Sequence, residues 1–163
     1  MKKLLLPVLL CAFILVTGCA AKNIPVDNQP KPQIKTSLEI IYRNEQYGFT
    51  LNLPKTWEGY SVSTSSVAAG QKIVIRQPKW TKDKPYEDIP VLVYSLAQWQ
   101  KWEANNFADY QTAAPIGPTE RGRNESYVFA TAPRYNFDFL TGFEEVETII
   151  SGLKTFSPLK INK

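Results

Sequence analysis

The stretch that decides the fold is Tyr47-Gly48-Phe49-Thr50-Leu51-Asn52-Leu53-Pro54. Its large apolar residues fall at every second position from Phe49 to Leu53, with polar residues between them. This period of two predicts a strand with one buried face, and Pro54 ends it because proline cannot donate to a sheet ladder. We expect residues 57–62 to return as the second strand of a hairpin.

Later apolar segments predict further strands. Residues 71–76 contain three consecutive β-branched residues, and residues 89–96 carry the apolar run of a well-buried strand. Residues 120–123 and 126–132 predict another hairpin, which turns at Arg123-Asn124-Glu125. Short connections of this kind favour antiparallel pairing.

Two segments have helical spacing. The first follows the strand at 89–96 and is indicated by Leu96, Trp99, Trp102, Glu103 and Phe107. The second has one apolar stripe made by Phe143, Val146, Ile149, Ile150 and Leu153. Thr141 and Glu144 have the spacing of a capping box at its start. The expected fold is α+β, a central antiparallel sheet of about six strands flanked by two main helices.

The segment from Tyr47 to Trp57, with its "GF…P…W" pattern, is similar to the opening of PsbP/Mog1-like domains. The closing helix followed by Leu153-Lys154-Thr155-Phe156 also resembles that family, which commonly ends in a helix and a short strand. With residues 75–80 and 114–118, the chain resembles small uncharacterised bacterial lipoproteins. The resemblance covers residues 40–159 and implies an antiparallel sheet with flanking helices. It implies binding of partner proteins and carries over no residue role.

The N-terminus has the form of an export signal. Lys2 and Lys3 precede an uncharged apolar run at residues 4–16, which is shorter than the roughly 20 residues of a spanning helix. The run ends in Val16-Thr17-Gly18-Cys19, which resembles a lipoprotein lipobox. We expect Cys19 to be lipidated and to become the first mature residue. The alternative is an ordinary secretory signal, cleaved after Ala20 or Ala21.

The resulting domain organisation has three parts. Residues 1–18 are the expected signal peptide, residues 19–37 the lipidated cysteine and a proline-rich tether, and residues 38–163 a single globular domain. The tether has too few large apolar residues to repay its ordering entropy. It would hold the domain tens of ångströms from the bilayer, because its prolines favour extended backbone.

Composition excludes several chemistries. Cys11 lies in the expected signal and Cys19 carries the lipid, so the mature domain has no free thiol, and the chain has no His. Cys–His and Ser–His–Asp catalysis and imidazole-bound zinc are therefore excluded. Without Lys2 and Lys3, 17 basic residues face 15 acidic ones, a net charge near +2. This small excess predicts no nucleic-acid partner, and we expect no cofactor and no metal.

Two groups of side chains are candidate binding sites. The first is a polar loop with aromatic residues beside lysines, formed by Trp80, Lys82, Lys84 and Tyr86. It could stack on a sugar or grip an acidic partner, although a solvated loop with Trp80 tucked under the domain edge is the favoured interpretation. The second is a set of candidate anion contacts, Arg121, Arg123 and Arg134, near Tyr127 and Tyr135. Strand alternation favours instead Arg121 and Arg123 on one solvated face.

Two further constellations have plain structural interpretations. Trp99 and Trp102, three residues apart, could form a carbohydrate platform, but core packing is favoured. Glu103 with Asp109, or Asp83 with Asp88, could act as an acid–base pair, although their spacing does not distinguish them from surface charge.

The predicted function is a non-catalytic, membrane-anchored interaction or assembly module facing outside the cytoplasm, on the cell membrane or the outer membrane. Its partners would be the membrane, through the lipid on Cys19, and an envelope protein or glycan. The first alternative is a glycan or small-ligand receptor that uses exposed aromatics near Trp80. The second is a carboxylate-dependent hydrolase.

Overall fold

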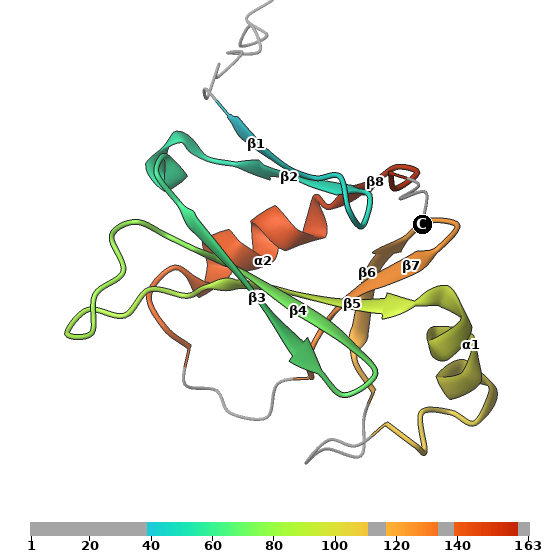
Figure 1. Cartoon of the computed structure of the whole chain (residues 1–163). Helices are drawn as coiled ribbons and strands as arrows, with labels where there is room; N and C mark the ends of the chain where they lie inside the picture. The colour runs from blue at the N-terminus through green and yellow to red at the C-terminus, as the bar shows by residue number, and fades with distance from the viewer. Residues whose placement is uncertain (1–38, 111–116, 134–138, 160–163) are drawn as a thin grey trace, which may run out of the picture. The chain divides into compact units, whose positions relative to one another are not determined.

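The computed structural model describes residues 39–110, 117–133 and 139–159, which adopt an α+β fold (Figure 1). This confirms the expected class. The strands are β1 (Ile40–Asn44), β2 (Phe49–Leu53), β3 (Ser61–Val67), β4 (Gly70–Arg76), β5 (Ile89–Ser95), β6 (Thr119–Arg123), β7 (Tyr127–Thr131) and β8 (Lys154–Thr155). The helices are α1 (Leu96–Ala104) and α2 (Phe143–Ser151), with a 3-10 turn at Lys55–Trp57. The expected signal and tether, residues 1–37, lie outside the described residues, and the first described residue of the domain is Glu39.

The strands form two sheets, so the expectation of one central sheet is wrong. The first sheet has the order β1-β2-β8, and the second has the order β3-β4-β5-β7-β6. All neighbouring pairs are antiparallel. The division arises after β2, because the chain leaves the first sheet at Pro54 and begins the second at Ser61.

The predicted hairpin of residues 57–62 with β2 is also wrong. Trp57 ends the 3-10 turn that follows Pro54, and Gly59 then reverses the chain with a φ of 87°. β3 starts at Ser61 and pairs with β4. β2 instead forms its hairpin with β1, a strand that the sequence patterns did not predict.

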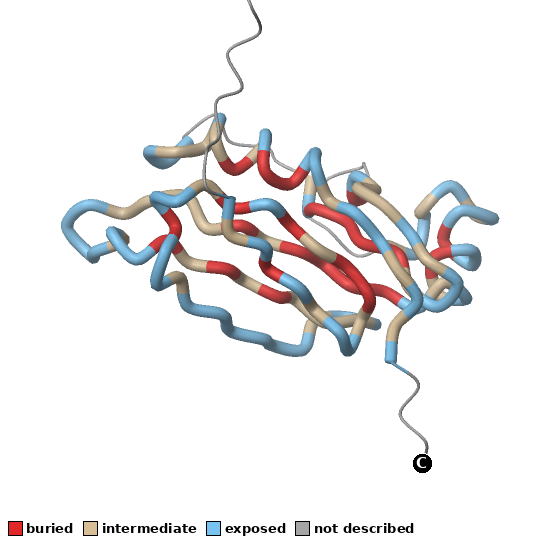
Figure 2. Tube along the Cα trace, turned by 90° about the horizontal axis from the view of Figure 1, so that it is seen from above, coloured by how far each residue is buried: buried red, intermediate tan, exposed pale blue. Residues whose placement is uncertain are grey.

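The main core lies between the two sheets and α2. Val146, Ile149 and Ile150 of α2 are buried in the same cluster as β2 and the inner face of β5. The rings of Phe49 and Phe129 meet there with centroids 4.9 Å apart, which joins the two sheets directly. Figure 2 shows buried residues running through the middle of the inner strands and exposed residues in the connections, whereas β3 is exposed along nearly its whole length. Burial of large apolar side chains at about 1.5–3 kcal/mol each makes this core the main stabilising feature.

Helix α1 covers the opposite face of the larger sheet. Trp99 and Trp102 are buried against Tyr94 and Val128, which confirms their role as core anchors. The helix begins at Ser95, whose side chain accepts the N–H of Gln98 at 3.2 Å. It ends at Ala104, before the expected Phe107.

Helix α2 begins without the predicted capping box. Its N-cap is Gly142, which has a φ of 88° and makes no side-chain cap. The backbone of Thr141 instead forms an isolated parallel bridge with Tyr86. A Cβ on Gly142 would lie 2.1 Å from the Tyr86 ring, so only glycine fits this approach. Among the residues described, neither helix has the length and apolar character needed to cross a membrane.

Candidate functional site

A groove of about 1100 Å³ lies beside α1. β5 and β7 are paired from Leu92↔Ala130 to Ser95↔Tyr127, and their other ends are not paired with each other. The groove lies over these unpaired ends, at Pro90 and Thr131, and reaches the start of α2 at Phe143. Its apolar lining includes Val74, Leu92, Tyr94, Trp102, Tyr110 and Phe143.

Some charged groups of the groove are paired within the protein, and others are able to contact a ligand. Asp88 is held by the Arg76 guanidinium in two parallel bonds, 3.0 Å to Nε and 2.7 Å to a terminal nitrogen. Lys72 and Lys101 also line the groove, and neither ammonium group forms an ion pair within the part of the chain described. Glu87, Asp109 and Glu147 also line the groove, so the site combines apolar and aromatic surface with charges of both signs, and Lys72 and Lys101 are its cations able to meet an acidic group.

The candidate loop at residues 80–86 does not present its four side chains together. Lys82 and Lys84 are exposed at a tight turn, in which the Lys84 N–H donates to the Thr81 hydroxyl at 3.0 Å. Trp80 is half-buried, and the guanidinium carbon of Arg76 lies 4.1 Å from its ring centroid. This cation–π contact occupies one face of the indole, as expected for a Trp tucked under the domain edge.

Tyr86 points away from the exposed part of this loop. Its hydroxyl donates to Glu145 at 2.5 Å, and its ring meets Trp57 edge-on with centroids 6.2 Å apart. The Trp57 Nε1 donates to the same Glu145 oxygen at 3.2 Å. Burial, followed by the contact with Glu145, raises the pKa of Tyr86 to about 12. Tyr86 is thus part of the packing between the loop and α2.

The two described arginines of the anion hypothesis do not cluster. Arg121 donates to Thr131 at 3.1 Å and to Glu147 of α2 at 2.9 Å. Arg123 instead reaches Glu103 of α1, on the other face of the sheet. The favoured alternative, both arginines on one solvated face, is therefore wrong. A register shift between Glu120 and Gly122 breaks the alternation that it assumed.

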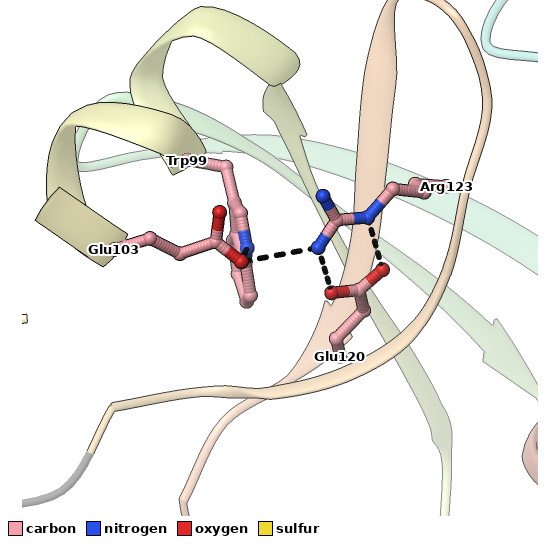
Figure 3. A network of polar contacts seen from close by, with 4 residues as sticks. All are labelled: Trp99, Glu103, Glu120 and Arg123. Atoms are coloured by element: carbon pink, nitrogen blue, oxygen red, sulfur yellow. Dashed lines mark hydrogen bonds and ion pairs between the residues drawn. The ribbon is translucent and has the colours of Figure 1, made fainter.

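Arg123 is occupied by carboxylates of the protein itself. Figure 3 shows its guanidinium between Glu103 and Glu120, with the Trp99 ring beside the Glu103 carboxylate. Arg123 donates to Glu103 at 3.1 Å and, through Nε, to Glu120 at 2.6 Å. The Trp99 Nε1 donates to the same Glu103 oxygen at 2.7 Å. This network ties α1 to β6. Arg134 and Tyr135 lie outside the described residues.

The proposed acid–base pairs are engaged in other contacts. The hydrogen bond from Trp99, and then that from Arg123, holds the pKa of Glu103 below its ordinary value. A general acid needs the opposite shift. Asp109 accepts from Asn105 at 2.6 Å, and Asp88 is bound by Arg76. The described residues contain no group of three or more side chains suited to holding a metal ion.

Sequence reasoning did not predict the groove, because its walls come from all five strands of the larger sheet and from both helices. The only available signal was the surplus of aromatics from Tyr94 to Tyr110, which pack edge-to-face around Trp102. Comparisons of the chain with family models, curated proteins and solved structures gave no match.

Proposed function

We propose that the chain is a lipid-anchored lipoprotein of the cell envelope whose domain is a non-catalytic interaction module. Cys19 would carry the lipid, and residues 20–37 would separate the domain from the bilayer. Stable anchoring takes more than one acyl chain, which a diacylglyceryl cysteine supplies. The domain would then display its groove to a partner outside the cytoplasm.

The groove carries this proposal. A concave, largely apolar surface with a few convergent polar groups is the usual form of a binding site. Tyr110 and Phe143, which are half-buried, supply the accessible aromatic area, and Lys72 and Lys101 supply charge. The partner that fits is a protein segment with apolar side chains and at least one acidic group.

The absence of a catalytic role is part of the proposal. The mature sequence has no His and no free thiol, which removes the commonest general base and the commonest strong nucleophile. The lowered pKa of Glu103 and the bidentate pairing of Asp88 support the same view. The glycan alternative has less support, because Trp99 and Trp102 are buried and Arg76 covers one face of Trp80.

Site-specific photo-crosslinking in intact cells tests the groove. A photoreactive residue at Lys72, in the groove, is expected to yield a discrete adduct with one envelope protein. The matched control carries the same residue at Thr148, which is exposed on α2 and does not line the groove. The same adducts from both positions, or none from Lys72 in a folded and exported chain, would contradict the proposal.

A further inference from the structure

The larger sheet has an edge that lacks the usual protection. β3 is an edge strand paired with β4 over all seven residues, from Ser61↔Arg76 to Val67↔Gly70, with no shift in register. Its sequence is Ser61-Val62-Ser63-Thr64-Ser65-Ser66-Val67. Six of these residues are exposed, and the strand contains neither a charge nor a proline. Edge strands normally carry charges, prolines or bulges, or are very short, because a free row of N–H and C=O groups pairs with other strands.

The other edge strands of the described structure are protected in these ways. β6 has two arginines, a glutamate and a shift in register between Glu120 and Gly122. β1 carries Arg43, and β8 has two residues. Among the described edge strands, β3 is therefore the one without a charge, a bulge or a very short length to oppose pairing with a further strand.

We infer that β3 is a self-association edge, at which a second copy of this chain adds its own β3 in antiparallel pairing. With a two-fold axis through Thr64, this residue faces its own copy. The remaining pairs are Ser63 with Ser65, Val62 with Ser66, and Ser61 with Val67. Each pair joins uncharged serine, threonine or valine side chains, which are favourable or neutral across strands.

The same geometry limits the assembly to two copies. The merged sheet has ten strands, five from each copy, and each copy uses its β3 edge. The outer edges are then the two β6 strands, which carry charges and the bulge. A closed two-fold dimer is the expected result, because no further unprotected edge remains in the larger sheet. The inference is independent of the groove and of the lipid.

Disulfide trapping tests the register directly, with the full chain in bacterial cells. Across the proposed axis the two Cβ atoms of residue 64 lie about 5 Å apart, close to the distance spanned by a disulfide. The two copies of Ser61 lie roughly 20 Å apart, because Ser61 and its partner position at Val67 are six steps apart along the strand. Thr64→Cys is therefore expected to give at least about five times more disulfide-linked dimer than Ser61→Cys. The unsubstituted chain gives the baseline from Cys11 and Cys19.

A charge variant distinguishes crosslinking through specific β3–β3 pairing from crosslinking through random collision of two chains. Adding Ser63→Lys and Ser65→Lys to Thr64→Cys places lysines opposite each other and is expected to reduce crosslinking to the baseline. The matched control adds Ser151→Lys and Ser157→Lys, at exposed residues outside β3, to Thr64→Cys. These two lysines should leave the crosslinking unchanged. Equal crosslinking at residues 61 and 64, or none at residue 64 in a folded chain, overturns the inference. If the cysteine variants do not fold, sedimentation of the unsubstituted chain decides, and a monomer at all concentrations overturns it.

Discussion

Asn124 joins three separate parts of the chain with one side chain. Its Nδ2 donates to the carbonyl oxygens of Tyr47 at 2.9 Å and Phe156 at 3.0 Å. Its Oδ1 accepts the N–H groups of Ser126 at 3.0 Å and Tyr127 at 2.9 Å. The amide therefore fixes the β6–β7 turn and ties it to the smaller sheet, a role that the predicted turn at this position did not reveal.

Removing this amide should destabilise the fold. Asn124→Ala leaves several part-buried backbone groups without a partner, and we expect the free energy of unfolding to fall by about 2 kcal/mol. Asn124→Asp should cost at least as much, because a carboxylate oxygen would face carbonyl oxygens. The measurement is urea denaturation. The control is Asn52→Ala, an exposed amide bonded to Glu39, with an expected loss of about 0.5 kcal/mol or less. Equal losses at the two positions would contradict this role.

Tyr86 makes stability sensitive to alkaline pH. Its pKa is raised from 10.0 to about 12, so the protonated phenol favours the folded state. Its contribution is fully present below about pH 10 and is lost as the pH rises toward 12. Tyr86→Phe should therefore make the decline in unfolding free energy shallower across this window. Some decline remains, because burial also raises the pKa of Tyr94. An unchanged pH profile in Tyr86→Phe would show that this phenol does not contribute.

Among the secondary-structure elements, the β3–β4 hairpin has an unfavourable turn residue. Val67 pairs with Gly70, which leaves Ala68 and Ala69 as the loop. Ala69 has a φ of 62°, a conformation that costs a residue with a Cβ roughly 1 kcal/mol. Ala69→Gly should therefore raise the free energy of unfolding by about 0.5–1 kcal/mol. Ala68→Gly, without a positive φ, should be neutral or destabilising. A larger gain at residue 68 than at residue 69 would contradict the assignment of strain.

Prediction of the elements succeeded where apolar periodicity was strong. β2, β4, β5 and α2 follow from alternation or helical spacing. β3 has no apolar alternation to detect, since its exposed face and edge are mostly serine and threonine. The β6 bulge has no clear sequence signal, so the positions of Arg121 and Arg123 could not be deduced from alternation.

At the scale of the whole molecule, the α+β class was predictable and the pairing of the strands was not. Short connections correctly indicated antiparallel neighbours, but they did not indicate that the chain changes sheets after Pro54. The return of β8 to β2 joins residues about a hundred positions apart, at Phe49↔Thr155. The groove depends on a different non-local arrangement, because its lining comes from the larger sheet and from both helices. In contrast, the lipid anchor is a proposal from local sequence, and it determines where the groove would be displayed.

The N-terminal residue of the mature chain distinguishes the two signal hypotheses. Cleavage at a lipobox leaves Cys19 first, with the mass of the attached lipid. Cleavage of an ordinary signal after Ala20 or Ala21 would leave Ala21 or Lys22 first and remove Cys19. Ala21→Ser is the matched control, because it lies outside the Val16–Cys19 motif.

The most direct test of the membrane-anchored account is the partitioning of Cys19→Ser between membrane and soluble fractions, with mass spectrometry of the N-terminal peptide. We expect the unsubstituted chain and Ala21→Ser in the membrane fraction, with a lipid-bearing Cys19 at the N-terminus. Cys19→Ser should remain as an uncleaved precursor or yield a soluble product without lipid. If Cys19→Ser is processed and partitions into detergent like the unsubstituted chain, the lipid anchor is contradicted.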